Sequence, residues 1–344
     1  MRNATSLLTT MAVSVLSLAS WVGGASAACQ MVKNAELDVR FVGNRPLVEA
    51  AINGHPVWIE VDTGAYNSAL FAPAAARLGL KGYDTGNRAI GVGGEVEVFR
   101  VDIAEFALQN AKVKNFQMDV AGGIHAGGRL GSGEREVVGL LGRDFLGLVD
   151  GVEFDLSHGK LRLLTFKDCG SRSLAYWAEG PGYVEMGRAG FKQAPFYFPL
   201  KINGYYIKST LDSGAGLTVV SRTVAAHAGV TEADYIGPTY RSAGIGNKLV
   251  ETKTATFHNI DLGDEKIAKA ELQITDLERG MDDGGTGSRV AASALPMLLG
   301  ADFLHSHRVL IAANQDRIYY TYEGGPVFHH VSSDPPAPRA DPAP

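Results

Sequence analysis

The stretches "AINGHPVWIEVDTGA" (residues 51–65) and "KINGYYIKSTLDSGA" (residues 201–215) follow one pattern at a constant offset of 150 residues. In each, an apolar strand pattern leads into Asn-Gly, a dipeptide typical of tight hairpin turns. A return strand then reaches an aspartate eight positions after the glycine. These aspartates, Asp62 and Asp212, are each followed by a hydroxyl residue, a glycine and an alanine. The repetition predicts two copies of one β-rich unit.

The two halves continue to match beyond the aspartates. Each contains a short alanine-rich helical pattern that stops at a glycine, then a glycine-rich stretch, an apolar run with Leu-Leu-Gly, and a closing hairpin pattern. These segments are residues 73–80, 91–94, 137–146 and 152–166 in the first half, and 223–230, 244–247, 295–304 and 309–322 in the second.

A third Asp-Thr-Gly occurs at Asp84, but it lies outside this pattern. Its flanking residues are polar, and the second half has no counterpart to it. Aspartate and glycine are common in exposed turns. We therefore expect Asp84 to be an exposed turn residue and Asp62 and Asp212 to be the related pair.

Length and composition fit a two-domain globular protein. The chain has 344 residues, 45% of them hydrophobic, and its 42 glycines show no triplet period, which favours β structure with many turns. A net charge of −5 without a basic stripe argues against nucleic acid as a partner. We expect a signal segment (1–27), a first repeat (28–166), a linker (167–194), a second repeat (195–325) and a disordered proline-rich tail (326–344).

The N-terminal residues have the pattern of a secretory signal. Arg2 precedes an apolar stretch at residues 7–22, and Ala-Ser-Ala at residues 25–27 offers a cleavage site before Ala28. We expect a periplasmic or secreted protein without a stable membrane span in the mature chain. An uncleaved membrane anchor is the alternative interpretation.

The chain has two cysteines, Cys29 and Cys169, which flank the first repeat. An exported chain meets an oxidising compartment, so a disulfide between them is expected. A lipid anchor on Cys29 is the alternative, although Ser26 stands where a lipobox has an aliphatic residue. The absence of Cys-x-x-Cys argues against a redox or metal role.

Two symmetry-related aspartates at matched turns suit general acid–base chemistry. Carboxylates within hydrogen-bond reach cannot both ionise cheaply, so they share one proton and titrate as a pair. The ionised member can deprotonate a water while the protonated member donates to a carbonyl oxygen. The hydroxyls of Thr63 and Ser213 are expected to hydrogen-bond across the axis, and Gly64 and Gly214 to allow close backbone approach or positive φ.

These motifs resemble the retropepsin/pepsin clan of aspartic proteases, and the chain is most similar to the retropepsin-like members found in bacteria. The resemblance covers residues 37–322 and rests on apolar-Asp-(Thr/Ser)-Gly-Ala, the flap-like Gly-x-Gly-Gly, and the apolar run that continues as "LLGRD". It implies an all-β fold of two lobes, each a β barrel, related by pseudo-twofold symmetry and with short helices. It also implies hairpin flaps that close over an extended peptide.

The resemblance assigns a role to each matching residue. Asp62 and Asp212 become the catalytic dyad, and Thr63, Gly64, Ser213 and Gly214 become its supports. The expected flap residues are Gly91, Val92, Gly93, Gly94, Gly244, Ile245 and Gly246, and the Leu-Gly pairs at 141–142 and 299–300 are expected to back the two turns.

Three features depart from the family pattern. Ala301 replaces the arginine that the first half has at Arg143, and Tyr66 and Gly216 replace a small polar residue. Ala65 and Ala215 offer no hydroxyl, whereas pepsin-like enzymes usually carry Ser or Thr there; with fewer hydrogen bonds to the ionised carboxylate, the pKa of the dyad is lowered less. We therefore expect activity at mildly acidic to near-neutral pH.

The sequence predicts an aspartic endopeptidase that acts on a peptide or protein substrate, with one chain sufficient for the active site. A catalytically silent peptide-binding module is the alternative, because a fold does not guarantee an activity. We expect no cofactor and no metal, because "HSH" at residues 305–307 lacks a third ligand. The absence of a Gly-x-Ser-x-Gly elbow argues against a serine hydrolase.

Overall fold

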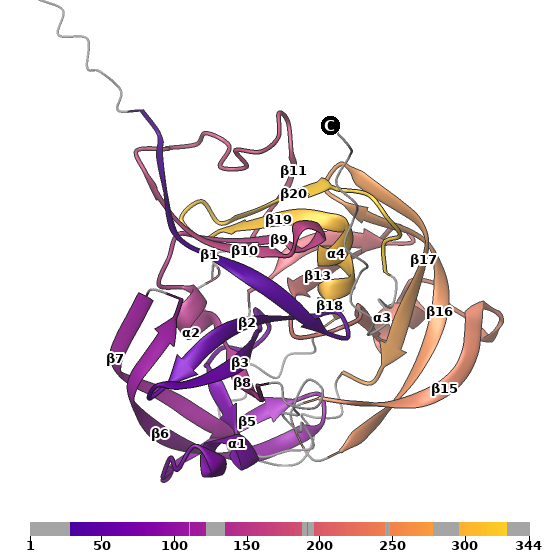
Figure 1. The fold of residues 1–344 in the computed structure, drawn as a ribbon. Helices are drawn as coiled ribbons and strands as arrows, with labels where there is room; N and C mark the ends of the chain where they lie inside the picture. Colours follow the sequence, from indigo (N-terminus) through magenta and orange to yellow (C-terminus); the bar gives the residue numbers. More distant parts are fainter. Residues whose placement is uncertain are drawn as a thin grey trace, which may run out of the picture.

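The computed structural model describes residues 28–109, 111–121, 135–187, 191, 196–244, 246, 248–277 and 296–328. The expected signal segment and residues 329–344 of the expected tail lie outside these ranges. The described chain is mostly β-strand with short helices, and its two halves form two lobes that meet in the middle of the molecule (Figure 1). The predicted all-β, two-lobed fold is therefore confirmed.

Apart from β1 in the first lobe and the 3₁₀ helix η2 in the second, the two lobes contain the same sequence of elements. The first comprises β1 (Gln30–Val42), β2 (Arg45–Ile52), β3 (His55–Val61), β4 (Ala69–Phe71), α1 (Ala72–Arg77), β5 (Tyr83–Gly91), β6 (Gly94–Leu108), β7 (Ala111–Ala121), β8 (Val137–Leu141) and α2 (Arg143–Leu146). The second comprises β12 (Phe198–Ile202), β13 (Tyr205–Leu211), β14 (Val219–Ser221), α3 (Arg222–His227), η2 (Glu232–Asp234), β15 (Tyr235–Ala243), β16 (Leu249–Leu262), β17 (Glu265–Thr275), β18 (Met297–Leu299) and α4 (Ala301–Ser306).

The strand order also repeats. In the first lobe it is β2-β3-β8-β4-β7-β6-β5, and in the second β12-β13-β18-β14-β17-β16-β15. Pairings β2–β6 and β12–β16 close each set of strands on itself. The duplication inferred from the sequence is therefore a duplication of topology.

Matching Asn-Gly turns precede β3 and β13, the strands that end immediately before the two aspartates. Asn53 and Gly54 have φ of 49° and 83°, and Asn203 and Gly204 have φ of 49° and 80°. Two successive positive φ values are characteristic of the type I′ turn, whose twist matches that of the flanking strands. The turns therefore set the register of β3 and β13, which lead directly to the two aspartates.

The closing hairpins of the two repeats join the lobes. They are β9 (Gly151–Asp155) with β10 (Lys160–Lys167), separated by η1 (Leu156–His158), and β19 (His307–Ala312) with β20 (Arg317–Tyr322). β9 pairs with β19, so one sheet runs in the order β11-β20-β19-β9-β10-β1, where β11 (Gly182–Glu185) comes from the expected linker. The sequence analysis did not predict this pairing between repeats.

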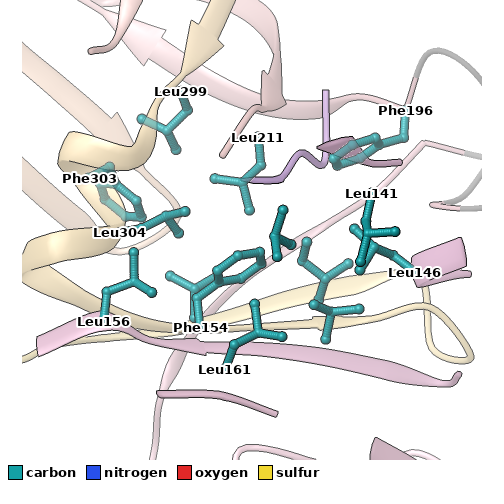
Figure 2. Close-up of a cluster of buried hydrophobic side chains, with 14 of the residues drawn as sticks. Leu141, Leu146, Phe154, Leu156, Leu161, Phe196, Leu211, Leu299, Phe303 and Leu304 are labelled. Atoms are coloured by element: carbon teal, nitrogen blue, oxygen red, sulfur yellow. The ribbon is translucent and has the colours of Figure 1, made fainter. Parts of the chain in front are cut away.

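The hydrophobic core is continuous beneath this shared sheet. Phe154 and Leu161 of the first repeat lie in one cluster with Phe303 and Leu304 of the second (Figure 2). Leu211, the residue before Asp212, belongs to the same cluster. The lobes therefore share apolar packing as well as backbone hydrogen bonds.

The ends of the ordered chain differ from the expectation. β1 starts at Gln30, within the expected first repeat but before residue 37, where the resemblance to the protease clan begins; the first half of this strand is exposed and lacks an apolar pattern. Phe328, assigned to the tail, is 4% exposed and stacks on Phe303. The folded chain therefore extends further in both directions. Among the described residues, no helix is long and apolar enough to cross a membrane.

Cys29 and Cys169 form a disulfide, as predicted. It joins the start of β1 to the segment after β10, next to the paired residues Gln30 and Lys167. The bond closes a loop with a sequence separation of 140 residues.

Removing this disulfide is expected to lower stability by about 2–4 kcal/mol, because the unfolded chain loses a long cross-link. The double variant Cys29→Ser/Cys169→Ser should show a lower melting temperature than the parent protein in a thermal unfolding experiment. Dithiothreitol should lower the melting temperature of the parent towards that of the variant and leave the variant unchanged. Equal melting temperatures for the oxidised parent and the variant would contradict a stabilising role.

Candidate active site

Each aspartate is held by the backbone of its own turn. Asp62 Oδ1 accepts hydrogen bonds from the amides of Gly64 and Ala65, at 2.8 and 3.0 Å. Asp212 Oδ1 accepts bonds of 3.0 Å from the amides of Gly214 and Ala215. Both carboxyl groups are therefore fixed in the same orientation relative to their strands.

The hydroxyls of Thr63 and Ser213 exchange hydrogen bonds between the lobes. The amide of Thr63 donates to Ser213 Oγ and the amide of Ser213 donates to Thr63 Oγ1, both at 3.0 Å. Each hydroxyl also donates to a carbonyl of the other lobe, Thr63 to Leu211 at 2.7 Å and Ser213 to Val61 at 2.6 Å. Both side chains are fully buried, and the predicted bonds across the axis are confirmed.

This exchange brings the two aspartates into contact, and a hydrogen bond joins the side chains of Asp62 and Asp212. The glycines after them make this approach possible. A Cβ atom on Gly64 would lie 2.5 Å from Asp212 Oδ1, and one on Gly214 would lie 2.5 Å from Asp62 Cγ. Of the two explanations that the sequence left open for these glycines, close approach applies.

The environments of the two carboxyls differ. Burial raises the pKa of both, and the charge of Asp62 raises the pKa of Asp212 well above its usual range. The amides of Ala65 and Gly64, together with the positive charge of Arg143, counteract the rise in the pKa of Asp62. These surroundings favour the ionised form at Asp62 and the protonated form at Asp212, within a pair that titrates as one unit.

Arg143 has no arginine counterpart in the second lobe, where Ala301 stands at the equivalent position. It is almost fully buried, with its Nε donating to the carbonyl of Ala65 at 3.3 Å. Its guanidinium lies 5.1 Å from the ring centre of Phe196 and 5.7 Å from that of Tyr66. Arg143 thus braces the first aspartate turn and places a positive charge on one side of the pair only.

A second carboxylate supports each turn from behind, and the sequence analysis assigned these residues no role. Asp144 accepts hydrogen bonds from the amide and hydroxyl of Ser68, at 2.8 and 2.7 Å. Asp302 does the same for Thr218, at 2.8 and 2.6 Å. Burial raises the pKa of Asp302 to about 6. The sequence does contain a sign of this support. Ser68 and Thr218, the hydroxyl residues that bond to these carboxylates, are separated by the same offset of 150 as the aspartates.

A buried carboxyl group that accepts a hydrogen bond from an arginine lies beside Asp62. Glu60, two residues earlier on β3, accepts a 2.8 Å bond from Arg45 and is 4% exposed. Burial and the nearby charge of Asp62 raise the pKa of Glu60 to about 8, against the effect of Arg45. The corresponding residue of the second lobe is Thr210. A charged residue in an otherwise apolar strand was the signal that the sequence analysis did not use.

The two glycine-rich stretches meet each other. Gly93 and Gly246 form a parallel bridge, and the amide of Lys248 donates to the carbonyl of Gly93 at 2.9 Å. A Cβ atom on Gly244 would lie 2.6 Å from Cβ of Val92, so the tips are in close contact. Gly91 and Gly94 pair at the tip of the β5–β6 hairpin. Ile245, also expected in a flap, lies outside the described residues.

Asp84 is an exposed residue of strand β5, away from the carboxyl pair. Its Oδ1 accepts a 2.8 Å bond from the amide of Gly86, where the pairing of β5 with β6 shifts register. The expected exposure is confirmed, although the position is an irregular strand rather than a loop.

The two histidines of the "HSH" motif hydrogen-bond to other residues of the fold. His305 Nε2 bonds to the carbonyl of Asn44 at 3.0 Å, and His307 lies between the carbonyl of Phe303 and the carboxyl of Glu265. Within the described ranges, no three His, Cys, Asp or Glu side chains gather as a metal site requires.

Known proteins with similar sequences and structures include aspartic proteases. A family model described as aspartyl protease matches residues 48–145, and a gag-polyprotein aspartyl protease model matches residues 198–306. Among solved structures, the chain is similar to a retropepsin-like aspartic protease from Rickettsia conorii, with 20% identity and a TM-score of 0.26 over 40% of this chain and 94% of that one. No curated protein matches the chain.

The pKa of Glu60 predicts a pH-dependent contribution to stability. Folded Glu60 keeps its proton to about pH 8, whereas an unfolded glutamate loses it near 4.5. Its contribution to the free energy of unfolding therefore falls as the pH rises between these values. Glu60→Gln cannot ionise, so the melting temperature of this variant relative to the parent should rise over this range and then level off.

The measurement is thermal unfolding of both proteins from about pH 5 to about pH 9. Glu97→Gln, at an exposed position of β6, is the matched control and should differ from the parent by a constant amount. A pH-independent difference for Glu60→Gln would show that Arg45 keeps Glu60 ionised in the folded protein.

Proposed function

Because the chain is a retropepsin-like member of the aspartyl protease family with two repeats, we propose that it is an aspartic endopeptidase that hydrolyses peptide or protein substrates. The observation that carries this proposal is the hydrogen-bonded pair of Asp62 and Asp212 in unequal environments. Such a pair offers a base and an acid at one point.

In the proposed mechanism, Asp62 takes a proton from a water molecule while the water oxygen attacks the peptide carbonyl carbon. Asp212 gives its proton to the carbonyl oxygen, which forms a tetrahedral diol without a covalent enzyme adduct. Asp62 then passes its proton to the amide nitrogen, and Asp212 recovers one from a diol hydroxyl as the C–N bond breaks. Each carboxyl thus returns to its starting state, and each transfer is general acid–base catalysis.

The flap tips support an extended polypeptide as the substrate class. They contact each other through Gly93 and Gly246, and β5 and β15 are strands of the hairpin arms that lead to them. An extended chain beneath them can use main-chain hydrogen bonds for affinity and side-chain pockets for specificity.

We also propose that one chain suffices and that the protein acts in the periplasm or outside the cell. One chain supplies both aspartates and both supporting hydroxyls. The signal pattern of residues 1–27 supports export, and so does the Cys29–Cys169 disulfide, because such bonds persist in oxidising compartments.

Replacement of either aspartate tests the proposed activity. Asp62→Asn and Asp212→Asn should each reduce cleavage of casein or of a peptide library by about 100-fold or more, because each removes a proton-transfer group. The purified protein of residues 28–344 is assayed across pH, with and without pepstatin.

Asp84→Asn is the matched control, since it changes the third Asp-Thr-Gly, and it should keep full activity. Cleavage that survives in both dyad variants would contradict the proposal. Binding of peptides by the parent without any cleavage would favour the silent peptide-binding module.

Arg143 predicts a shift in the pH profile. Activity requires Asp62 ionised and Asp212 protonated, and the raised pKa of Asp212 extends activity towards neutral pH. Arg143 lowers the pKa of Asp62, so Arg143→Gln should move the acid limb of kcat/KM to higher pH. Arg143→Lys keeps the charge and should shift less. An unchanged acid limb in a correctly folded Arg143→Gln protein would contradict this role.

A further inference from the structure

The guanidinium group of Arg100 lies near the first aspartate turn, where it pairs with Asp119. Arg100 donates from Nε and Nη2 to Asp119 Oδ1, at 3.1 and 2.9 Å. Asn67 donates to the other oxygen of Asp119 at 2.8 Å. Hydrogen bonding to Asp119 raises the pKa of Arg100, and the negative charge of Asp144 adds to this effect. Arg100 therefore lies close to the carboxylate that braces the first turn.

Strand register identifies the equivalent positions in the second lobe. The amide of Asp119 donates to the carbonyl of Ser68, and the amide of Gln273 donates to that of Thr218. Arg100 is the β6 partner of Asp119, and Thr254 is the β16 partner of Gln273. Thr254 thus stands in place of Arg100, Gln273 in place of Asp119, and Leu217 in place of Asn67.

These three replacements leave a cavity of about 310 Å³. It lies between the turn at Leu217 and Thr218, the strands β15 to β17, and helix α4, and Phe328 forms one wall. The volume is in the range of small-molecule binding sites. The first lobe holds its own arginine at the equivalent position.

The chemistry of the cavity suits a cation. Its lining residues include two acidic residues, Asp302 and Glu271, together with Gln273 and the aromatic residue Tyr240. None of the described residues that line it is basic. Glu271 is exposed, whereas Asp302 is buried, with its carboxyl accepting bonds from Thr218 and Phe303. The carboxyl of Asp302 already accepts from the amide and hydroxyl of Thr218 and from the amide of Phe303, so the exposed Glu271 is the carboxylate that a further donor can reach.

We propose that this cavity binds a guanidinium group, the side chain of a free arginine derivative or of an arginine within a peptide, in the position that Arg100 occupies in the first lobe. The planar guanidinium matches carboxylate geometry through two parallel bonds and stacks on aromatic rings. The proposal does not depend on proteolysis, because the cavity lies behind the second turn.

Isothermal titration of the protein of residues 28–344 tests the proposal with three compounds. N-acetyl-arginine amide and the capped peptide Gly-Arg-Gly represent the free and peptide sources, and N-acetyl-citrulline amide is the neutral isostere. We expect saturable binding of at least one arginine compound and none of the citrulline compound. Binding of the peptide alone would identify a peptide as the source. Binding of neither arginine compound, or equal binding of the citrulline compound, would overturn the proposal.

Variants locate the site. Thr254→Arg/Gln273→Asp recreates the pair of the first lobe and should abolish binding by filling the cavity. Glu271→Gln should weaken binding by about ten-fold, the effect of losing a hydrogen bond to a charged group. Glu179→Gln, at an exposed position, is the control and should bind as the parent does.

Binding unchanged in Glu271→Gln and in a folded Thr254→Arg/Gln273→Asp protein would place the ligand elsewhere and refute the proposed site. If the double variant fails to fold, Glu271→Gln and the citrulline comparison still decide the question. Cleavage assays of the same proteins are separate, so a failed binding test and a failed protease test remain distinguishable.

Discussion

The exchange of hydrogen bonds between Thr63 and Ser213 is the constraint on which the site depends. Each hydroxyl accepts from the amide of the other and donates to a carbonyl of the opposite lobe. Separation of the lobes would leave these buried groups without partners, which is costly for each of them. The same bonds fix the backbone on both sides of the aspartates, so contact between Asp62 and Asp212 follows from the packing of their neighbours.

The two repeats share one backbone arrangement, but they differ in the charged residues around the two aspartates. Arg143 and the Arg45–Glu60 pair lie on the side of Asp62, whereas the equivalent second-lobe residues are Ala301 and Thr210. Two identical halves would give two equivalent carboxyls. Here the surrounding charges favour the proton on Asp212, and a change on one side alone can alter this preference.

The repeat made much of the site predictable, because residues at equal offsets occupy equivalent places. The aspartate pair and the hydroxyls of Thr63 and Ser213 followed from spacing and residue type, whereas the disulfide was predicted from the two cysteines and the secretory signal pattern. The pairing of β9 with β19 did not, since contact between repeats depends on how the lobes pack. The cavity in the second lobe could not be predicted either, because only strand register brings Leu217, Thr254 and Gln273 together.

The shared sheet and the flap bridge differ in how easily they can open. The lobes are held by the β9–β19 ladder, the common core and the hydroxyl exchange, whereas the described residues of the flap tips are joined by the Gly93–Gly246 bridge and the bond from the amide of Lys248 to the carbonyl of Gly93. One such backbone hydrogen bond contributes only ~1 kcal/mol net. Parting the two flap tips therefore breaks far fewer contacts than parting the lobes does, so the hairpin arms can open while the two lobes stay packed.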